Sequence, residues 1–519
     1  MVTRRHRRWI GLAILAGWML VLAWHVRREY YQSTTLRLAE ASASLIPSAS
    51  FYSIKLGDTP IGYAASRVDT LAAGFLLEDD MRLRILALGA DAPVSARTRV
   101  RLGKRLELQE FEFTLRSDLG DFAVVGVMNG DSMLELTINS GGGEEQRLTI
   151  PRDGPIVLPQ VMPMHFALGE EPQPGATYAY EIFDPSVLER QRVSIEVIGR
   201  DTLIVPDSAG FDEVKQIWAP ARFDTVETWR IRQGFGGIEL DSWLDPDGQV
   251  VRATSPLGYT IERTAFEIAW NTYRNLGSRG GATAALGASD IIERTAISVG
   301  AGLPSGERIA RLAVRLGNVD LEGFDLEGDQ QQLRGDTLVT AAHQLPERID
   351  YRLPASRSEW GKVLEATPLI QAEDPEIRRA AEEILGGVTE PGQAAERLNR
   401  WVYENLDKQI TLSVPSARQV LDGRRGDCNE HTVLYVALAR AAGLPARTAA
   451  GLVYVRDRFY YHAWPEVWLG SWVPVDPTLN QFPADASHLR FVIGGLARQV
   501  ELVRLVGLLQ LDVLSVEEK

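Results

Sequence analysis

Three residues near the carboxyl end of the chain have the types and the order that thiol catalysis needs. Cys428 is the only cysteine among 519 residues, and His462 and Asp476 follow it. A thiolate can attack a carbonyl carbon once a histidine takes the thiol proton, and a carboxylate can orient that histidine and stabilise its cation. These types predict Cys428 as nucleophile, His462 as base and Asp476 as orienting carboxylate. A buried, unreactive thiol is the alternative for a lone cysteine.

The residues around Cys428 predict a helix that positions the thiol. Asp427 stands at the N-cap, Glu430 can close a capping box, and Gly443 can end the helix. Residues that recur at helical spacing predict one buried face: His431, Leu434, Tyr435, Leu438, Ala441 and Ala442. Cys428 is thus expected in the first turn, where the free N–H groups favour a thiolate and its own N–H can join an oxyanion hole. The helix dipole gives about 0.3–1 kcal/mol, less than one pKa unit, so a cationic His462 is also needed.

Two adjacent strands are expected to bring the histidine and the aspartate together. A period-two pattern puts His462 on one face of a strand, and Gly470-Ser471 turns the chain back toward Asp476. A tight two-residue turn would place Asp476 opposite Pro465, on the face away from His462. We therefore predict a one-residue bulge near Pro465 or Pro474, or a wider turn. Because Pro465 has no N–H, its strand is expected to be an edge or bulged there.

The blocks around these residues resemble the transglutaminase-like superfamily. In chain order they are Gly-Asp-Cys-x-Glu-His, Ala-Gly-Leu-Pro-Ala-Arg, His-Ala-Trp-x-Glu-Val-Trp and Trp-Val-Pro-Val-Asp-Pro-Thr. The resemblance covers about 374–491 and implies a papain-like α+β core with the same roles for Cys428, His462 and Asp476. It also implies that Trp464 and Trp472 line or support the site. The family includes cross-linking acyltransferases, peptidases and amidases, so the fold does not fix the reaction.

The rest of the chain is predicted to be β-rich before this α+β domain. Alternating patterns predict strands at 82–88 and 107–113, within a β-rich domain over 50–275, and Asp245-Pro246-Asp247-Gly248 predicts a hairpin turn. We further predict a Gly- and Ala-rich linker at 276–289, a small β domain over 290–353, the transglutaminase-like domain over 360–500, and a strand or tail over 501–519. Helices are expected at 374–385 and 392–406.

The amino terminus predicts a membrane anchor within residues 1–30. Four arginines precede an apolar run from Trp9 to Val26, and Arg27-Arg28 follow it. This charge pattern predicts a single-pass signal anchor in the cytoplasmic membrane, with the bulk of the chain on the periplasmic side. A cleaved signal peptide is the alternative, although no small-x-small site follows the run. The net charge of −14 argues against nucleic acid as a partner.

The leading hypothesis is a membrane-anchored, extracytoplasmic thiol enzyme. It would act on peptide or protein amide bonds through a thioester at Cys428, with hydrolysis preferred over amine transfer because water is always present. The chemistry requires no cofactor, and no residue spacing indicates a metal. The alternative is a non-catalytic scaffold or binding module, and no pattern identifies a partner of the β domains. His431 is interpreted as a core histidine, and His343 and His488 carry no signal of a partner.

Overall fold

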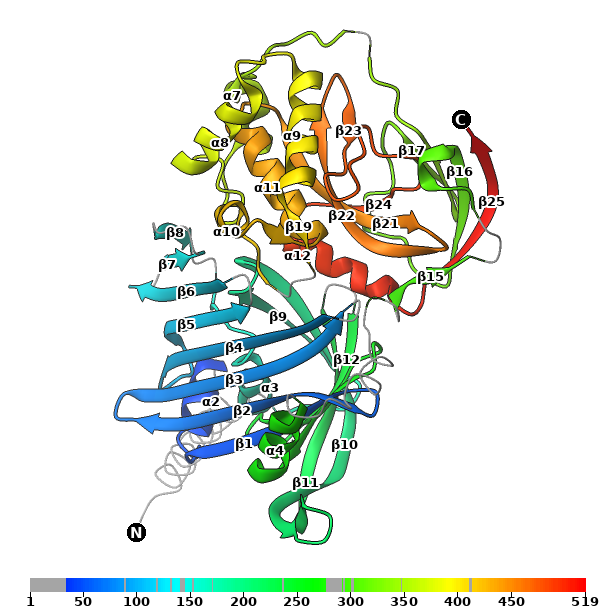
Figure 1. Cartoon of the computed structure of the whole chain (residues 1–519). Helices are drawn as coiled ribbons and strands as arrows, with labels where there is room; N and C mark the ends of the chain where they lie inside the picture. The colour runs from blue at the N-terminus through cyan, green and yellow to red at the C-terminus, as the bar shows by residue number, and fades with distance from the viewer. Residues whose placement is uncertain are drawn as a thin grey trace, which may run out of the picture.

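The computed structural model describes residues 34–519 apart from 88–89, 118–119, 131–132, 141–144, 152–153, 170, 236–237, 277–291, 293–294, 300–302, 347 and 410–412. The predicted signal anchor and nearly all of the predicted linker lie outside the described residues. Within the described part of the chain, no helix is both long and apolar enough to cross a bilayer. The chain forms two lobes, which we call the sheet lobe (34–276) and the C-terminal lobe (from 295 onward) (Figure 1).

The sheet lobe is built on one antiparallel sheet of fourteen strands. Their order is β8-β7-β6-β5-β4-β3-β2-β1-β14-β13-β12-β11-β10-β9, so the first and last strands in sequence, β1 and β14, pair in the middle. The strands are β1 (Ser48–Leu56), β2 (Thr59–Leu71), β3 (Gly74–Ala87), β4 (Ala90–Gly103), β5 (Leu108–Ser117), β6 (Gly120–Asn129), β7 (Met133–Asn139), β8 (Gln146–Pro151), β9 (Thr177–Asp184), β10 (Glu189–Asp212), β11 (Ile217–Phe235), β12 (Ile238–Leu244), β13 (Val250–Thr254) and β14 (Tyr259–Thr264).

The two halves of this sheet share one hydrophobic core. Phe111 of β5 lies 6.0 Å from Phe183 of β9, between ring centroids, and both side chains are buried. Helices α2 (Thr34–Ser42) and α3 (Met162–Gly169) add side chains to that core, and α4 (Phe266–Leu276) packs on β1 and β2. The predicted hairpin turn is confirmed, because the Gly248 N–H donates to the Asp245 carbonyl oxygen at 2.9 Å between β12 and β13. The β-rich prediction for this part of the chain is also confirmed.

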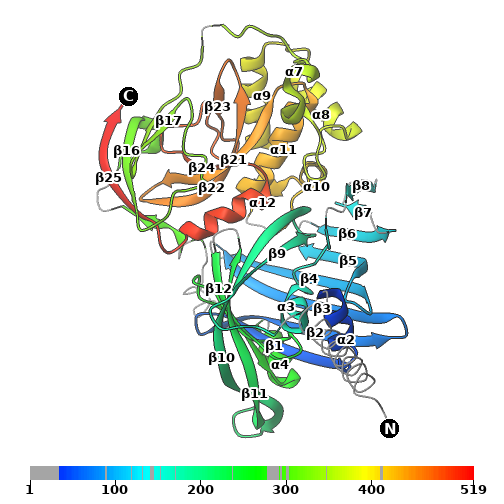
Figure 2. The same ribbon diagram turned by 180° about the vertical axis from the view of Figure 1, so that it is seen from behind.

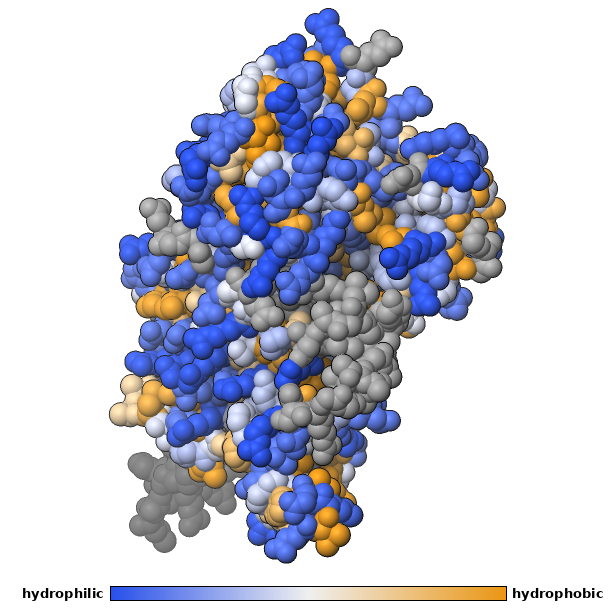
Figure 3. All heavy atoms as spheres, in the orientation of Figure 1, coloured by the Kyte–Doolittle hydropathy of each residue, from blue (hydrophilic) through white to orange (hydrophobic). Residues whose placement is uncertain are grey.

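The hairpin of β10 and β11 extends beyond the strands beside it. Strand β9 pairs with β10 only as far as Glu196, and β12 pairs with β11 only from Trp229 onward. The far part of the hairpin is therefore a two-stranded ribbon, at the lower end of Figure 1. Hydrophobic and hydrophilic side chains mix there in Figure 3, and the exposed apolar ones include Ile204, Val214 and Phe223.

The C-terminal lobe contains a group of helices, a central sheet and a smaller sheet. The helices are α7 (Arg357–Leu364), α8 (Pro375–Leu385), α9 (Pro391–Asn405), α10 (Ala417–Gly423), α11 (Cys428–Ala441) and α12 (Leu496–Gln499), with 3-10 turns η1 (Gly306–Arg308) and η2 (Val500–Leu505). The strands are β15 (Ile297–Ser298), β16 (Ile309–Gly317), β17 (Gln331–Arg334), β18 (Thr337–Ala341), β19 (Asp407–Lys408), β20 (Arg425–Gly426), β21 (Ala446–Val455), β22 (Arg458–Trp468), β23 (Trp472–Pro474), β24 (Leu489–Ile493) and β25 (Gln510–Glu518).

These elements form three layers, which Figure 2 shows from behind. Helices α8, α9, α10 and α11 pack together on one side of the sheet β15-β22-β21-β24, to which β23 is joined through β22. The sheet β17-β18-β16-β25 packs on the other side. The strands that were predicted as a small domain over 290–353 therefore share a core with the central sheet, and the chain end returns as β25 to pair with β16. This fold class, α+β behind a β-rich region, agrees with the sequence prediction.

The two lobes meet beside the amino end of α11. The Ser416 hydroxyl donates to the Ser140 carbonyl oxygen at 2.7 Å, and the Gln419 side-chain amide donates to the Asp121 carbonyl oxygen at 2.9 Å. Val414 is buried in the core of the sheet lobe. The segment that leads into Cys428 is thus held in place by contacts with the sheet lobe.

Candidate functional site

Helix α11 begins at Cys428 because a capping box satisfies its first turn. The Asn429 N–H donates to the Asp427 carboxylate at 2.8 Å, and the Asp427 N–H donates to the Glu430 carboxylate at 2.9 Å. The other end closes at Gly443, whose φ of +74° is left-handed, and the Leu444 N–H donates to the Ala439 carbonyl oxygen at 2.8 Å. Both predicted helix ends are confirmed.

The environment of α11 differs from the predicted single buried face. All residues from 430 to 440 are buried, because α8 and α9 cover one side of the helix and β22 covers the other. Val436 and Ala437, on the other side of the helix, are fully buried as well. The helix is the centre of the lobe, which fixes the position of Cys428 at its end.

The connection from β22 to β23 is wider than a two-residue turn. Glu466 pairs with Pro474 and Trp468 with Trp472, so three residues, 469–471, join the strands. The Val475 N–H then donates to the Pro465 carbonyl oxygen at 2.9 Å. This register carries Asp476 to the face of β22 that holds His462, and the predicted wider turn is confirmed. Strand β22 pairs with β21 without a bulge, and its ladder with β23 stops before Pro465, which makes that residue locally an edge.

Asp476 and His462 are in direct contact. His462 Nε2 lies 2.7 Å from Asp476 Oδ2, and the Asp476 side chain is fully buried. The other carboxylate oxygen accepts from the backbone N–H groups of Thr478 at 2.7 Å and Leu479 at 2.9 Å. Burial alone would raise the pKa of Asp476, but His462 and His488 hold it well below its usual range. The carboxylate is therefore a fixed anion that orients His462 through Nε2 and leaves Nδ1 free to face another group.

Cys428 lies against the strand that carries His462. The N–H of Ala463, the next residue, donates a hydrogen bond to the Cys428 sulfur, and Cys428 is half-buried. Burial raises the pKa of the Cys428 thiol well above its usual range, the Asp427 charge adds to the rise, and the Ala463 hydrogen bond opposes it. The expected thiolate at the helix end is thus not the resting form, because desolvation and acidic neighbours outweigh the helix dipole.

A second histidine, His488, completes the group around Asp476. Its Nε2 lies 3.0 Å from Asp476 Oδ2, and its Nδ1 lies 3.3 Å from Asp485 Oδ1. Burial alone would lower the pKa of His488, but the two carboxylates raise it to about 9. The sequence interpretation missed this residue, since the only local signal is Asp485 three positions earlier, and the contact with Asp476 depends on how the loop after β23 folds back.

The two tryptophans implied by the resemblance lie in different places. Trp464 is fully buried, stacks on His462 with 6.1 Å between ring centroids, and meets His488 edge-on at 5.1 Å. It therefore packs against both histidine rings. Trp472 pairs with Trp468, six positions along β22 from His462, which is about 20 Å of strand. It stacks under the guanidinium of Arg447, so its placement does not match the role of lining the site.

The remaining histidine on α11 is part of the core. His431 is fully buried, and its Nδ1 lies 2.6 Å from the Asp427 carbonyl oxygen. Burial lowers its pKa, which favours a neutral ring. Its placement agrees with the interpretation as a core histidine.

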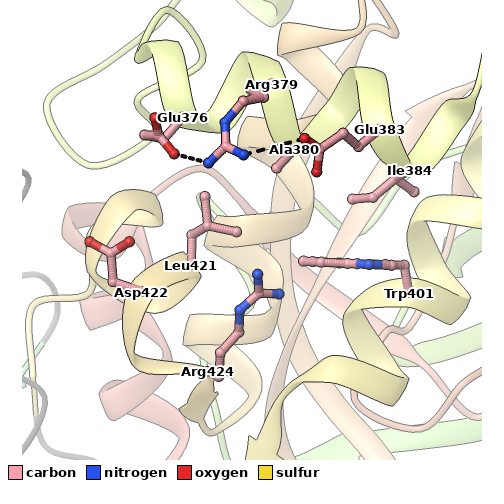
Figure 4. Close-up of a pocket in the computed structure, with 9 residues that line it drawn as sticks. All are labelled: Glu376, Arg379, Ala380, Glu383, Ile384, Trp401, Leu421, Asp422 and Arg424. Carbon is pink, nitrogen blue, oxygen red and sulfur yellow. Dashed lines mark hydrogen bonds and ion pairs between the residues drawn. The ribbon is translucent and has the colours of Figure 1, made fainter.

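A separate hollow of about 440 Å³ lies among α8, α9 and α10 (Figure 4). Arg379 is ion-paired with Glu376 and Glu383 on one wall, and the Arg424 guanidinium stacks on Trp401 at 4.5 Å. Its lining contains none of the three predicted catalytic residues. The hollow is therefore distinct from the Cys428 group.

Comparisons with known proteins identify a family for part of the C-terminal lobe. Residues 378–477 match the family model of the transglutaminase-like superfamily, which confirms the resemblance for that segment. An uncharacterized protein of Haemophilus influenzae is 32% identical over 94 residues, which are 17% of this chain and 25% of that protein, so the match spans about a quarter of the relative's length.

Two solved structures are also similar to the chain. A candidate cysteine protease from Cytophaga hutchinsonii has 14% identity and a TM-score of 0.27, and covers 41% of this chain and 86% of its own. A candidate protease from Parabacteroides distasonis has 9% identity and a TM-score of 0.17, and covers 84% of this chain and 70% of its own. These scores are too low to establish a fold or an activity.

Proposed function

We propose that this chain, whose residues 378–477 form a transglutaminase-like domain, is a thiol enzyme that acts on amide bonds of peptides or proteins. One observation carries the proposal: His462, joined to Asp476 at 2.7 Å, is the neighbour in β22 of Ala463, whose N–H reaches the Cys428 sulfur. A nucleophile beside a base, with the base held by a third group, is the arrangement that acyl transfer requires.

The proposed reaction starts from a neutral thiol. His462 Nδ1 takes the proton of Cys428 as the sulfur attacks the amide carbonyl carbon, while Nε2–H stays donated to Asp476. The Cys428 N–H at the helix start donates to the developing oxyanion. His462 then gives its proton to the leaving amine, the C–N bond breaks, and a thioester remains on Cys428. Water or an amine attacks the thioester carbonyl carbon and loses a proton to His462. The C–S bond breaks, the acyl product leaves, and the sulfur takes the proton from His462 to restore the thiol.

Within this proposal, hydrolysis is preferred over amine transfer, since water needs no second binding site. The predicted anchor at Trp9–Val26 extends the proposal to a membrane-attached enzyme with its bulk on the periplasmic side. Incubation with dimethylated casein and a fluorescent primary amine compares the two outcomes. Peptide release without labelling supports hydrolysis, and faster incorporation of the amine supports transfer.

Alkylation of Cys428 by iodoacetamide at pH 7.5 tests the thiol site without a known substrate. We expect His462→Ala to slow alkylation at least about tenfold, because the base that takes the thiol proton is lost. His343→Ala is the matched control, since His343 belongs to the same lobe but contacts Ser471 instead, and its rate should equal that of the unaltered chain. Equal rates in all three proteins would contradict the proposed function and favour a non-catalytic binding module.

A further inference from the structure

The proposed chemistry does not use His488, the second histidine in contact with Asp476. His488 is fully buried, and each of its ring nitrogens faces a carboxylate oxygen, of Asp476 at 3.0 Å and of Asp485 at 3.3 Å. An ionised carboxylate accepts hydrogen bonds and cannot donate them. A ring that satisfies two such acceptors must carry a proton on both nitrogens, so the contacts require an imidazolium.

The surroundings fix both carboxylates as acceptors. Asp485 Oδ1 accepts from the Ser487 hydroxyl at 2.5 Å and from the Ser487 N–H at 2.8 Å, and its other oxygen accepts from Gln481 at 2.7 Å. Asp476 already accepts from two backbone N–H groups on its other oxygen. The pKa of Asp485 agrees with its role as an acceptor. Burial alone would raise it, but His488 and the other donors lower it to about 2.

Asp476 therefore stands between two histidines. The same oxygen, Oδ2, accepts from His462 at 2.7 Å and from His488 at 3.0 Å, and the two rings lie 6.0 Å apart between centroids. A fixed positive charge at this distance offsets part of the Asp476 charge and disfavours a second cation on His462. A base that must return its proton to a leaving amine benefits, because an unopposed buried carboxylate would hold that proton too tightly.

We propose that His488 is a positioning residue of the thiol site: a buried cation that anchors Asp476 from the side opposite His462 and limits how strongly the carboxylate holds the His462 proton. This inference rests on the proposed function for its catalytic meaning. Among the described residues, the titratable groups that face His488 are Asp485 in its own segment, Asp476 after β23, and His462 on β22. The nearby Arg490 guanidinium is directed to Glu466.

The distances favour protons over a metal ion at this point. The three atoms His462 Nε2, Asp476 Oδ2 and His488 Nε2 lie within 4.8 Å of one another, a grouping that can also suit a cation. The N···O separations of 2.7 and 3.0 Å are hydrogen-bond lengths. Ligands held at about 2.1 Å around a tetrahedral zinc stand about 3.4 Å apart, farther than both.

Nuclear magnetic resonance of the histidine rings in the full chain tests the inference, and seven histidines make assignment by single substitutions practical. We expect both nitrogens of His488 to be protonated at pH 7.5, and Asp485→Asn to lower the pH at which the ring loses its proton. His488→Gln should shift the pH profile of Cys428 alkylation by about half a pH unit or more, because a cation 6.0 Å from the His462 ring is removed. His343→Gln is the matched control and should leave this profile unchanged.

Each other result overturns the inference. A neutral His488 at pH 7.5 excludes the cation, and an unchanged alkylation profile in a folded His488→Gln protein leaves His488 with a structural role only. Ring signals that change on addition of EDTA assign the atoms to a bound metal. Should His488→Gln fail to fold, the Asp485→Asn measurement decides. Iodoacetamide alkylation of the same samples separates the two proposals, since loss of His462-dependent reactivity rejects the thiol enzyme even where His488 is charged.

Discussion

Glu466 of β22 lies opposite Pro474 of β23, and this register decides which face of the strand pair Asp476 occupies. Side chains alternate between the two faces of a strand, so a shift of one residue moves the carboxylate to the other face. The three-residue connection 469–471 produces the register that brings Asp476 to His462. The length of a surface turn thus controls the geometry of the candidate catalytic group.

Shortening β23 by one residue should disconnect the group. Deletion of Val473 keeps the three-residue connection but brings Asp476 opposite Pro465, on the face of β22 away from His462. We expect alkylation of Cys428 to fall by about a hundredfold, comparable to the loss of general-base assistance. Ser471→Ala removes the hydroxyl contact with His343 but keeps the chain length, and it should retain the full rate. A deletion protein that is folded and fully reactive would show that Asp476 is not required.

The pH dependence of the thiol follows from its surroundings. Burial and the Asp427 charge raise the pKa of Cys428, so the thiol form dominates at pH 7 and the thiolate increases only as the pH rises past the ordinary value of about 8.5. We expect the alkylation rate to keep rising above pH 10, where a free cysteine peptide has levelled off. Alkylation that is quenched at set times and measured by mass spectrometry gives the pH dependence of the rate for both the chain and the peptide. A plateau already present at pH 7 would instead indicate a preformed thiolate–imidazolium pair.

Stability should depend on pH through His488. Its pKa rises from 6.5 to about 9 in the folded chain because two carboxylates outweigh burial. The contribution is therefore complete below pH 6.5 and is lost as the pH rises through 9, at about 1.4 kcal/mol per pH unit and about 3 kcal/mol in all. Urea unfolding of the C-terminal lobe at pH 6, 7.5 and 9 measures this slope. His488→Gln should flatten it, and an equal slope in both proteins would assign the effect to other groups.

Two glycines allow the packing at the end of α11 to be measured. Gly443 and Gly507 have nearly the same left-handed φ, +74° and +73°. A Cβ on Gly443 would lie 2.4 Å from Pro354 Cβ, whereas a Cβ on Gly507 meets nothing within 4 Å. Backbone strain should lower the free energy of unfolding of both alanine variants by about 1–2 kcal/mol. Overpacking should lower that of Gly443→Ala by about 1–3 kcal/mol more. Equal losses, measured by urea unfolding, would show that Pro354 moves aside.

The buried Glu466 offers a test of the sheet beneath the site. It is fully buried and pairs with Arg447 at 2.6 Å and Arg490 at 3.0 Å. Glu466→Ala leaves the buried Arg490 and the partly exposed Arg447 without this partner and should cost about 3–5 kcal/mol. The exposed Glu396, paired with Arg400 on α9, is the control, and Glu396→Ala should change stability by less than about 1 kcal/mol. A small effect of Glu466→Ala would indicate that water enters to solvate both arginines.

The sequence by itself determined the features that depend on neighbours along the chain. Asp427 and Glu430 cap α11, Gly443 ends it, and the transglutaminase-like blocks name Cys428, His462 and Asp476, because capping, turn chemistry and motif spacing are local. The need for either a bulge or a turn wider than two residues also followed from strand alternation alone.

Tertiary structure decided what depends on contacts between distant segments. Burial of the whole of α11, the raised pKa of Cys428, and the placement of Trp472 away from His462 all arise from packing that no local pattern encodes. The same holds for the small β segment, whose core is shared with β22 and β25. His488 is the clearest case: its ring meets Asp476 only because the loop after β23 folds back, and the field of a buried charge depends on three-dimensional distance instead of sequence separation.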